Sequence, residues 1–290
     1  MIKKLCVCVG VCLVFTLSPA LHDQTGDSLL WEEEAMAAMS QSLEHQIPPM
    51  EPLEEKIEGL IAGKSGQWSV YLKNLETEEE LVYNSVQMQP ASVIKLFRMV
   101  ALYQAAQRSE LELTEELLKL AEKMITVSDN AASNEIVAAL GQGSFEAGVK
   151  RVTQTAQELG CTQTQDEMML FDYDPGFLVP GHNLTTVQDC GIILEQIYWK
   201  ECVSPQYDQE MLYLLLGQTR RWKIPALLPG GARVANKTGE TDDIQADVGI
   251  VFSPKCDYVI CVIVNQTLDG LESQQTIAEL SQLVYSYLND

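Results

Sequence analysis

Residues 89–102, with the sequence QPASVIKLFRMVAL, form a stretch that is almost continuously apolar after its proline. Only Ser92, Lys95 and Arg98 interrupt the apolar run. A helix that is apolar on nearly every side is a buried helix. Ser92 and Lys95 lie three positions apart, so they share one face of this predicted helix. We expect the rest of the chain to pack around it.

A serine and a lysine on a buried helix need a chemical explanation, because lysine is rarely buried without a partner. Burial lowers the basicity of a lysine amine, and the neutral amine can then take the proton of a serine hydroxyl. A helix that starts at Ser92 also directs backbone N–H groups at a developing oxyanion. The pattern is weak by itself, so this interpretation depends on partners elsewhere in the chain.

Residues 1–20 have the pattern of a secretory signal peptide. Lys3 and Lys4 precede a mostly apolar segment over 5–17, and small residues follow up to Ala20. The apolar run is short for a membrane span, which disfavours an uncleaved anchor. We therefore expect an exported protein, secreted or on the cell-envelope side, that is cleaved near Ala20 and has no stable membrane span afterwards.

The pattern of apolar periods and turn residues predicts an α+β fold. Residues 21–51 are acidic and lack a sustained period, so they are predicted to be a leader or linker. Residues 52–290 are the predicted catalytic domain, with a sheet lobe (52–90 and 232–290) and a helical lobe (91–231). We expect one antiparallel five-stranded sheet flanked by helices. The predicted strands are 68–72, 80–84, 233–239, 246–252 and 257–264; the predicted helices include 53–62, 113–125, 184–199, 207–216 and 272–288.

The charge balance limits the class of partner. The formal net charge is −22, with 41 acidic and 19 basic residues, and loss of the signal would make the chain more acidic still. This acidity disfavours nucleic acid and anionic membranes as partners. An anionic substrate would have to be drawn in by a local cationic pocket. We expect a monomer.

Cysteine and histidine positions predict neither a metal site nor a Ser-His-Asp triad. Three of the cysteines lie in the signal segment, and the odd number that follows fits no zinc spacing. We expect core thiols with at most one bridged pair, and no metal or other cofactor. The later cysteines are Cys161, Cys190, Cys202, Cys256 and Cys261, and the histidines, which lie in the leader region or a loop, are His22, His45 and His182.

Two further short motifs supply the partners that Ser92 needs. Ser128-Asp129-Asn130 lies between predicted helices and offers a hydroxyl that can carry a proton and an amide that can hold a substrate carbonyl. Lys237-Thr238-Gly239 lies at the end of a predicted strand and offers a second cation and a hydroxyl for a substrate carboxylate. Each motif alone is common, since the first is also a helix cap and the second a strand-end turn.

The three motifs occur in a diagnostic order. Ser128 follows Ser92 by 36 residues, and Lys237 follows Ser128 by 109. S-x-x-K, S-D-N and K-T-G in this order are the signature of class A β-lactamases and penicillin-binding proteins. From about Leu53 to Asp290 the chain resembles these class A β-lactamase-like serine hydrolases. The substrate implied is a β-lactam or a peptidoglycan peptide that ends in D-Ala-D-Ala.

The resemblance implies a role for each matched residue. Ser92 would be the acylated nucleophile, Lys95 its base or proton relay, and Ser128 the donor to the leaving nitrogen. The residues that would bind substrate are Asn130 for the acyl-amide side chain, Lys237 and Thr238 for the carboxylate, Gly239 beside the ligand, and the backbone N–H groups of Ser92 and Glu240 as the oxyanion hole. Arg220, Arg221, Lys223 and Arg233 are undistinguished candidates for further contacts to the carboxylate.

One departure from the class A pattern concerns the residue that activates the deacylating water. The family carries this glutamate in the loop before the helix that starts here at Asn183, whereas the equivalent position falls on Met168. Glu167 is adjacent and is the candidate base. Other carboxylates in this stretch are Asp166, Asp172 and Asp174. Glu240, after Gly239, replaces a small residue and adds negative charge at the rim of the pocket.

Three readings of the function follow. The chain could be a class A-like β-lactamase that hydrolyses the β-lactam amide through an acyl-enzyme. The missing glutamate favours the alternative of a D,D-carboxypeptidase or penicillin-binding-type hydrolase with poor deacylation of β-lactams. A third reading is a penicillin-sensing or peptidoglycan-binding module without turnover.

Overall fold

Five strands form one antiparallel sheet in the computed structural model, which describes residues 47–171 and 182–290. The strand order is β2-β1-β5-β4-β3, so the first strand of the chain pairs with the last one and β2 lies at the edge of the sheet. The strands are β1 (Gln67–Asn74), β2 (Glu80–Tyr83), β3 (Arg233–Glu240), β4 (Gln245–Phe252) and β5 (Tyr258–Asn265). This sheet confirms the predicted α+β fold, and Ile47–Asp290 forms one compact unit.

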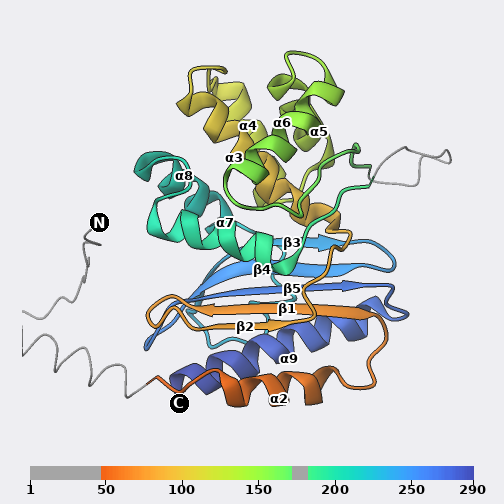
Figure 1. The fold of residues 1–290 in the computed structure, drawn as a ribbon, viewed down its shortest axis with the longest axis vertical. Coiled ribbons are helices and arrows are strands. Elements are labelled where there is room, and N and C mark those ends of the chain that lie inside the picture. The colour runs from red at the N-terminus through yellow and green to blue at the C-terminus, as the bar shows by residue number, and fades with distance from the viewer. Residues whose placement is uncertain (1–46, 172–181) are drawn as a thin grey trace, which may run out of the picture. The chain divides into compact units, whose positions relative to one another are not determined.

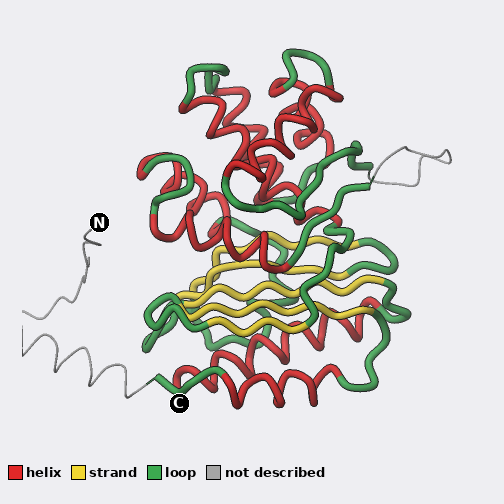
Figure 2. Tube along the Cα trace, in the orientation of Figure 1, coloured by secondary structure: helices red, strands yellow, loops and turns green. Residues whose placement is uncertain are grey.

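Helices cover both faces of the sheet. Helices α2 and α9 lie against one face, and the helical lobe that includes α3 and α7 lies on the other (Figures 1 and 2). The helices are α2 (Glu51–Ile61), α3 (Ile94–Gln107), α4 (Glu115–Thr126), α5 (Asn130–Leu140), α6 (Phe145–Glu158), α7 (Val187–Trp199), α8 (Pro205–Leu216) and α9 (Gly270–Asn289).

The central strand β5 shows why the sheet needs two helical layers. Its residues are buried on both faces, so the strand is apolar at almost every position instead of alternating with polar residues. Val259, Cys261 and Ile263 belong to the core shared with the helical lobe. Tyr258, Ile260, Val262 and Val264 belong to the second core, under α2 and α9.

Helix α3 is buried over most of its length, as its apolar sequence predicts. Its start differs from the prediction, because Ala91–Val93 forms a 3₁₀ turn and the α-helix begins only at Ile94. Ala91 has a φ of 45°, in the left-handed region that few residues other than glycine adopt. Ser92 therefore lies in a tight turn in front of the helix.

Helix α7 begins at Val187, three residues later than predicted, because Leu184 and Thr185 form isolated bridges. Thr186 caps the helix, since its hydroxyl accepts a hydrogen bond from the backbone N–H of Asp189. The preceding chain, from Cys161 onward, contains no helix or strand up to residue 171, and only an isolated bridge joins Gln165 to Leu184. Asp172 and Asp174, like residues 1–46 with the signal segment, lie outside the described residues.

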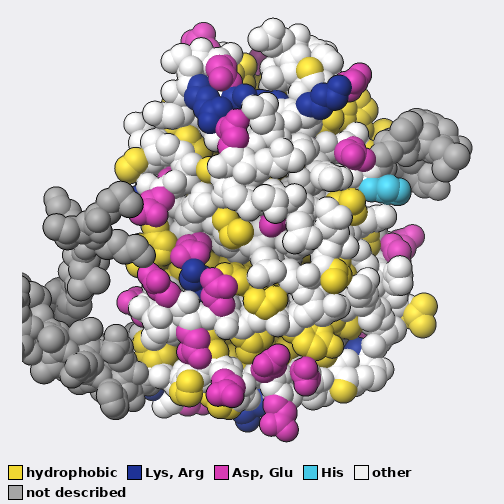
Figure 3. Space-filling model, in the orientation of Figure 1, with side chains coloured by type: hydrophobic (Ala, Val, Ile, Leu, Met, Phe, Trp, Pro, Cys, Tyr) yellow, Lys and Arg dark blue, Asp and Glu magenta, His cyan; other side chains and the backbone are white. Residues whose placement is uncertain are grey.

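The five cysteines of the described region are buried and none is bridged. Burial raises the pKa of each thiol, so these side chains are core residues. Acidic side chains are scattered over the molecular face in Figure 3. Among the described residues, no helix has the length and apolar character that crossing a membrane requires.

Two helix glycines give a test of the packing. A Cβ atom at Gly148 in α6 would overlap the carbonyl oxygen of Val137 in α5, whereas a Cβ at Gly59 in α2 would meet no atom within 4 Å. We predict that Gly148→Ala lowers the free energy of unfolding by about 2 kcal/mol or more. Gly59→Ala should leave it unchanged or raise it by up to about 1 kcal/mol through helix propensity. Urea denaturation of both variants checks this, and equal effects would contradict the close approach of α5 and α6.

Candidate active site

The amine of Lys95 lies at the centre of a buried hydrogen-bond cluster. Its Nζ is 3.0 Å from Ser92 Oγ and 3.1 Å from Ser128 Oγ. It is also 2.6 Å from both Ser128 O and Asn130 Oδ1. Lys95 has no exposed surface. The first two sequence motifs therefore meet at one nitrogen atom.

The turn between α4 and α5 aims Ser128 at this cluster. Ser128 has a φ of 63°, a strained value for a residue that is not glycine. The next residue, Asp129, caps α5 by accepting a hydrogen bond from the backbone N–H of Ala132. The cap fixes where α5 starts. The left-handed backbone of Ser128 turns its own side chain toward Lys95. Strain of this kind is common at functional sites.

Lys237 on β3 brings the third motif to the same place. Its Nζ is 2.9 Å from Ser128 Oγ and 2.6 Å from Thr238 O. The Ser128 hydroxyl thus lies between two lysine amines. Lys237 is fully buried, and burial, followed by the nearby amine of Lys95, holds the pKa of Lys237 well below its usual value.

Gly239 is required because β3 runs very close to the turn that carries the serine. A Cβ atom at Gly239 would lie 2.6 Å from Pro90 O and 2.9 Å from Ser92 N. Any side chain there would push the strand away from Ser92. The glycine of the third motif therefore sets the distance between the nucleophile and the strand.

Of the four cations considered for the substrate carboxylate, the structure brings Lys223 closest to the motif. Its Nζ is 2.8 Å from Thr238 Oγ1 and 2.9 Å from Gly239 O. Burial lowers the pKa of Lys223. Arg220 lies beside it and pairs with Glu240 at 2.8 Å.

The other two cations are more exposed than Lys223. Arg221 is exposed. Arg233 lies at the opposite end of β3 from Gly239, with its guanidinium 4.8 Å from the ring centre of Phe252.

A cleft of about 490 Å³ lies beside the serine turn. One wall is the loop segment Met168, Met169, Leu170 and Phe171, which is apolar at every position. The other lining residues are Gln89, Pro90, Ala91, Asn183, Glu240, Thr241, Asp242 and Ile244. The residue at the position where the class A glutamate was expected, Met168, therefore faces the cleft.

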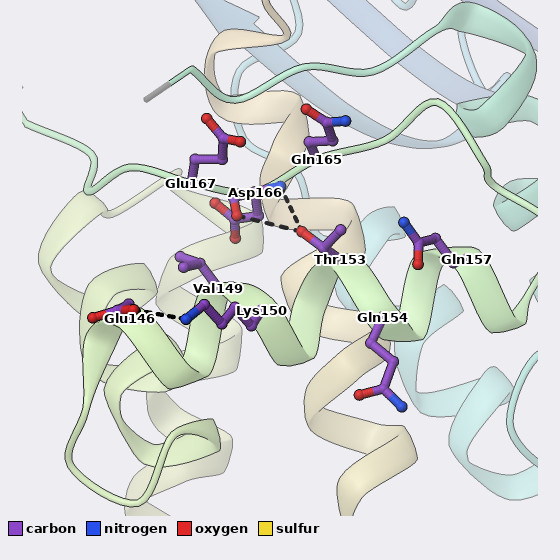
Figure 4. Close-up of a pocket in the computed structure, with 9 residues that line it drawn as sticks. All are labelled: Glu146, Val149, Lys150, Thr153, Gln154, Gln157, Gln165, Asp166 and Glu167. Atoms are coloured by element: carbon purple, nitrogen blue, oxygen red, sulfur yellow. Dashed lines mark hydrogen bonds and ion pairs between the residues drawn. The ribbon is translucent and has the colours of Figure 1, made fainter. Parts of the chain in front are cut away.

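The structure does not bring the candidate base Glu167 into this cleft. Glu167 is exposed and lines a separate groove of about 430 Å³ against α6 (Figure 4). Its carboxylate accepts a hydrogen bond from the backbone N–H of His182. Neighbouring residues in the loop face different sides, so Glu167 and Met168 diverge. This placement gives no support to Glu167 as a base.

The loop wall is held by a buried ion pair that the sequence analysis missed. Arg98 Nε and Nη2 lie 2.7 Å from the two carboxylate oxygens of Asp166, and neither side chain has exposed surface. Arg98 also donates to the carbonyl of Met168 at 2.8 Å and to Ser133 Oγ at 3.0 Å. A second charged residue on the buried helix, three positions after Lys95, was the available signal, because a buried arginine requires a carboxylate partner.

Two asparagines of α5 complete the clamp on the loop. Asn134 exchanges hydrogen bonds with the backbone of Leu170, at 2.8 and 3.0 Å. Asn130 donates to the carbonyl of Phe171 at 3.0 Å while its oxygen accepts from Lys95. Asn130 therefore links the lysine cluster to the loop wall. Among the described residues no group of His, Cys, Asp and Glu is arranged to hold a metal ion.

Comparisons with known proteins agree with this fold. The sequence model of the family described as "Beta-lactamase enzyme family" matches residues 52–119 and 116–288 of the chain. Among solved structures, TLA-1 extended spectrum beta-lactamase is 19% identical with a TM-score of 0.76, covering 84% of this chain and 100% of that one. A beta-lactamase from Sphaerobacter thermophilus is 19% identical with a TM-score of 0.72, covering 82% and 97%.

PBP-A is more similar in sequence. It is 26% identical with a TM-score of 0.72, covering 83% of this chain and 98% of that one. A single-residue variant of PBP-A has been solved as an acyl-enzyme complex with penicillin G. A comparison with curated protein sequences gives no match.

The lowered pKa of Lys237 predicts a pH dependence of stability. The folded protein binds fewer protons at this amine than the unfolded chain, so stability rises with pH from the lowered folded pKa to the ordinary lysine pKa of about 10.4. Lys237→Met removes this contribution. Between about pH 7 and about pH 10, we expect the unfolding free energy of the wild type to increase by about 1 kcal/mol or more relative to that of the variant.

Urea denaturation at several pH values measures this difference. Lys56→Met, on the exposed side of α2, is the control and should keep the wild-type slope. Parallel pH profiles for the wild type and Lys237→Met would contradict the assignment.

Proposed function

Since the chain belongs to the beta-lactamase enzyme family, we propose that it is a serine hydrolase in which Ser92 attacks the amide carbonyl of a β-lactam or of a D-Ala-D-Ala peptide. The observation that carries this proposal is the buried amine of Lys95, 3.0 Å from Ser92 Oγ and 3.1 Å from Ser128 Oγ. The residue roles below are part of the proposal. We further propose that the protein acts after export.

Acylation needs a route for one proton. The Ser92 hydroxyl gives its proton to the neutral amine of Lys95 as Oγ bonds to the carbonyl carbon. The proton then passes through the Ser128 hydroxyl to the amide nitrogen, and the carbon–nitrogen bond breaks. The backbone N–H groups of Ser92 and Glu240 stabilise the oxyanion. The product is an ester on Ser92; the amine leaves from a linear peptide and stays attached to the acyl group of an opened β-lactam.

Substrate binding is assigned to the strand side of the site. Lys237 and Thr238 hold the substrate carboxylate, and Lys223, which donates to Thr238 Oγ1 at 2.8 Å, supports them. Asn130 binds the acyl-amide side chain. Buried cations of this kind give the local positive charge that an acidic protein needs to bind an anionic substrate.

The fate of the acyl-enzyme separates the two candidate functions. A β-lactamase requires a group that activates water beside the ester. The loop wall beside the serine offers Met168, Met169, Leu170 and Phe171, none of which can act as a base. This observation favours the second candidate, a penicillin-binding or D,D-carboxypeptidase-type enzyme that deacylates β-lactams slowly.

We predict that labelled penicillin forms a covalent adduct with the wild type and none with Ser92→Ala, because the proposed nucleophile is the Ser92 hydroxyl, 3.0 Å from the Lys95 amine. Intact-protein mass spectrometry measures the adduct. Ser286→Ala, on the exposed surface of α9, is the matched control and should be labelled like the wild type. A Ser92→Ala protein that still forms the adduct, or a wild type that never does, would reject the nucleophile.

A second experiment tests the role of the apolar loop wall. Met168→Glu places a carboxylate in the cleft where water must be activated, and we expect the lifetime of the penicillin adduct to fall by about tenfold or more. Leu271→Glu, at an exposed position of α9, is the control and should change the lifetime by less than about twofold. Adduct mass followed over time gives both values.

Two results would change the conclusion. Equal lifetimes for the two variants would remove Met168 from the explanation. Rapid hydrolysis of nitrocefin by the wild type would instead support the β-lactamase candidate.

A further inference from the structure

The carboxylate of Glu240 lies among three hydrogen-bond donors at the end of β3. Arg220 Nη1 is 2.8 Å from Oε1, and Trp222 Nε1 is 3.3 Å from Oε2. The buried amine of Lys223 is 3.5 Å from Oε2. All three donors come from the segment that follows α8, and the guanidinium of Arg220 lies 5.9 Å from the ring centre of Trp222.

These donors form a receptor suited to a carboxylate. A guanidinium, an ammonium and an indole N–H that converge on two oxygen atoms match the acceptor geometry of that group. In this structure the receptor already holds a carboxylate that belongs to the chain itself. Glu240 is therefore an internal occupant of a cationic site.

The receptor is continuous with the place where substrate is proposed to bind. The Lys223 amine that contacts Glu240 also lies 2.8 Å from Thr238 Oγ1 and 2.9 Å from Gly239 O. Thr238 and Glu240 are two residues apart on one strand, so their side chains point to the same side. Glu240 also lines the cleft beside the serine turn.

The remaining carboxylate near Lys223 has a different role. Asp247 is fully buried, and it accepts hydrogen bonds from Asn236 Nδ2 at 2.8 Å and from the backbone N–H of Ile224 at 3.1 Å. Its oxygens thus hold the floor of the site in place. Glu240 keeps 27% of its side chain exposed, so an entering ligand can meet it.

We propose that Glu240 determines substrate specificity by competing with the ligand carboxylate for Arg220, Trp222 and Lys223. A ligand with a free carboxylate must displace Glu240 or lie next to its negative charge. A ligand of the same shape with an uncharged ester or amide at that position avoids this repulsion. Glu240 thereby reduces the advantage that the cations of the site give to an anionic end over a neutral one. This inference rests on the proposed acylation of Ser92.

The test compares two ligands that differ only in this charge, benzylpenicillin and its methyl ester. The second-order rate constant of acylation is measured for each by quenched-flow sampling and intact-protein mass. We expect Glu240→Gln to raise the rate with benzylpenicillin by at least about fivefold more than the rate with the ester. Glu240→Asp, which keeps the charge, should retain the wild-type ratio of the two rates.

Two further variants separate the proposal from a general effect on the fold. Glu272→Gln removes a surface carboxylate of α9 that pairs with Lys64 at 2.9 Å and should leave both rates unchanged. In the Glu240→Gln background, Arg220→Gln should cancel most of the gain with benzylpenicillin, because the freed guanidinium is the group that the ligand gains. Glu240→Ala gives the same comparison if the glutamine variant does not fold.

The results that overturn the proposal are distinct from those that overturn the function. An equal change for benzylpenicillin and its ester in Glu240→Gln, or a gain that persists in full without Arg220, would reject the competition while leaving acylation intact. No adduct with either ligand in the wild type and all variants would reject the acylating function, and the inference with it.

Discussion

The burial of one amine constrains the whole site. The Lys95 amine has no contact with solvent, and a buried lysine is tolerated only when its surroundings supply hydrogen-bond partners. Those partners are the serine turn in front of α3 and the turn between α4 and α5. Through Ser128 the same cluster extends to Lys237 on β3. Three segments that are remote in sequence are thus held together by the need to satisfy one nitrogen atom.

Most of the cations near this nitrogen lie beside a carboxylate or share a hydroxyl. Lys95 and Lys237 share the Ser128 hydroxyl, Lys223 lies between Asp247 and Glu240, and Arg220 faces Glu240. The local positive charge is therefore partly cancelled by two carboxylates, Glu240 at the end of β3 and Asp247 on β4. In a chain with a formal charge of −22, this local balance decides which anions can enter.

The sequence was sufficient for the features that depend on local pattern and motif order. The apolar run over 257–264 predicts the strand that the structure shows as β5, and the three motifs predict one shared site. Features that depend on the direction of side chains far apart in the chain could not be predicted from the sequence. Asp166 is 68 residues from Arg98, and the divergence of Glu167 from Met168 follows from how the clamped loop turns. The late start of α3 goes with the left-handed backbone of Ala91 and the 3₁₀ turn that follows, which no local signal encodes.

The ion pair between Arg98 and Asp166 also restricts how such a protein can change over generations. Both charges are buried. Losing either residue alone would leave the other charge buried without a partner, at a cost of about 3–5 kcal/mol, which is much of a domain's net stability. A lineage can keep the pair or replace both members, but it has no easy intermediate. The apolar wall beside the serine is therefore inherited with that pair, and new catalytic side chains in the wall must arise by substitutions that leave this anchor in place.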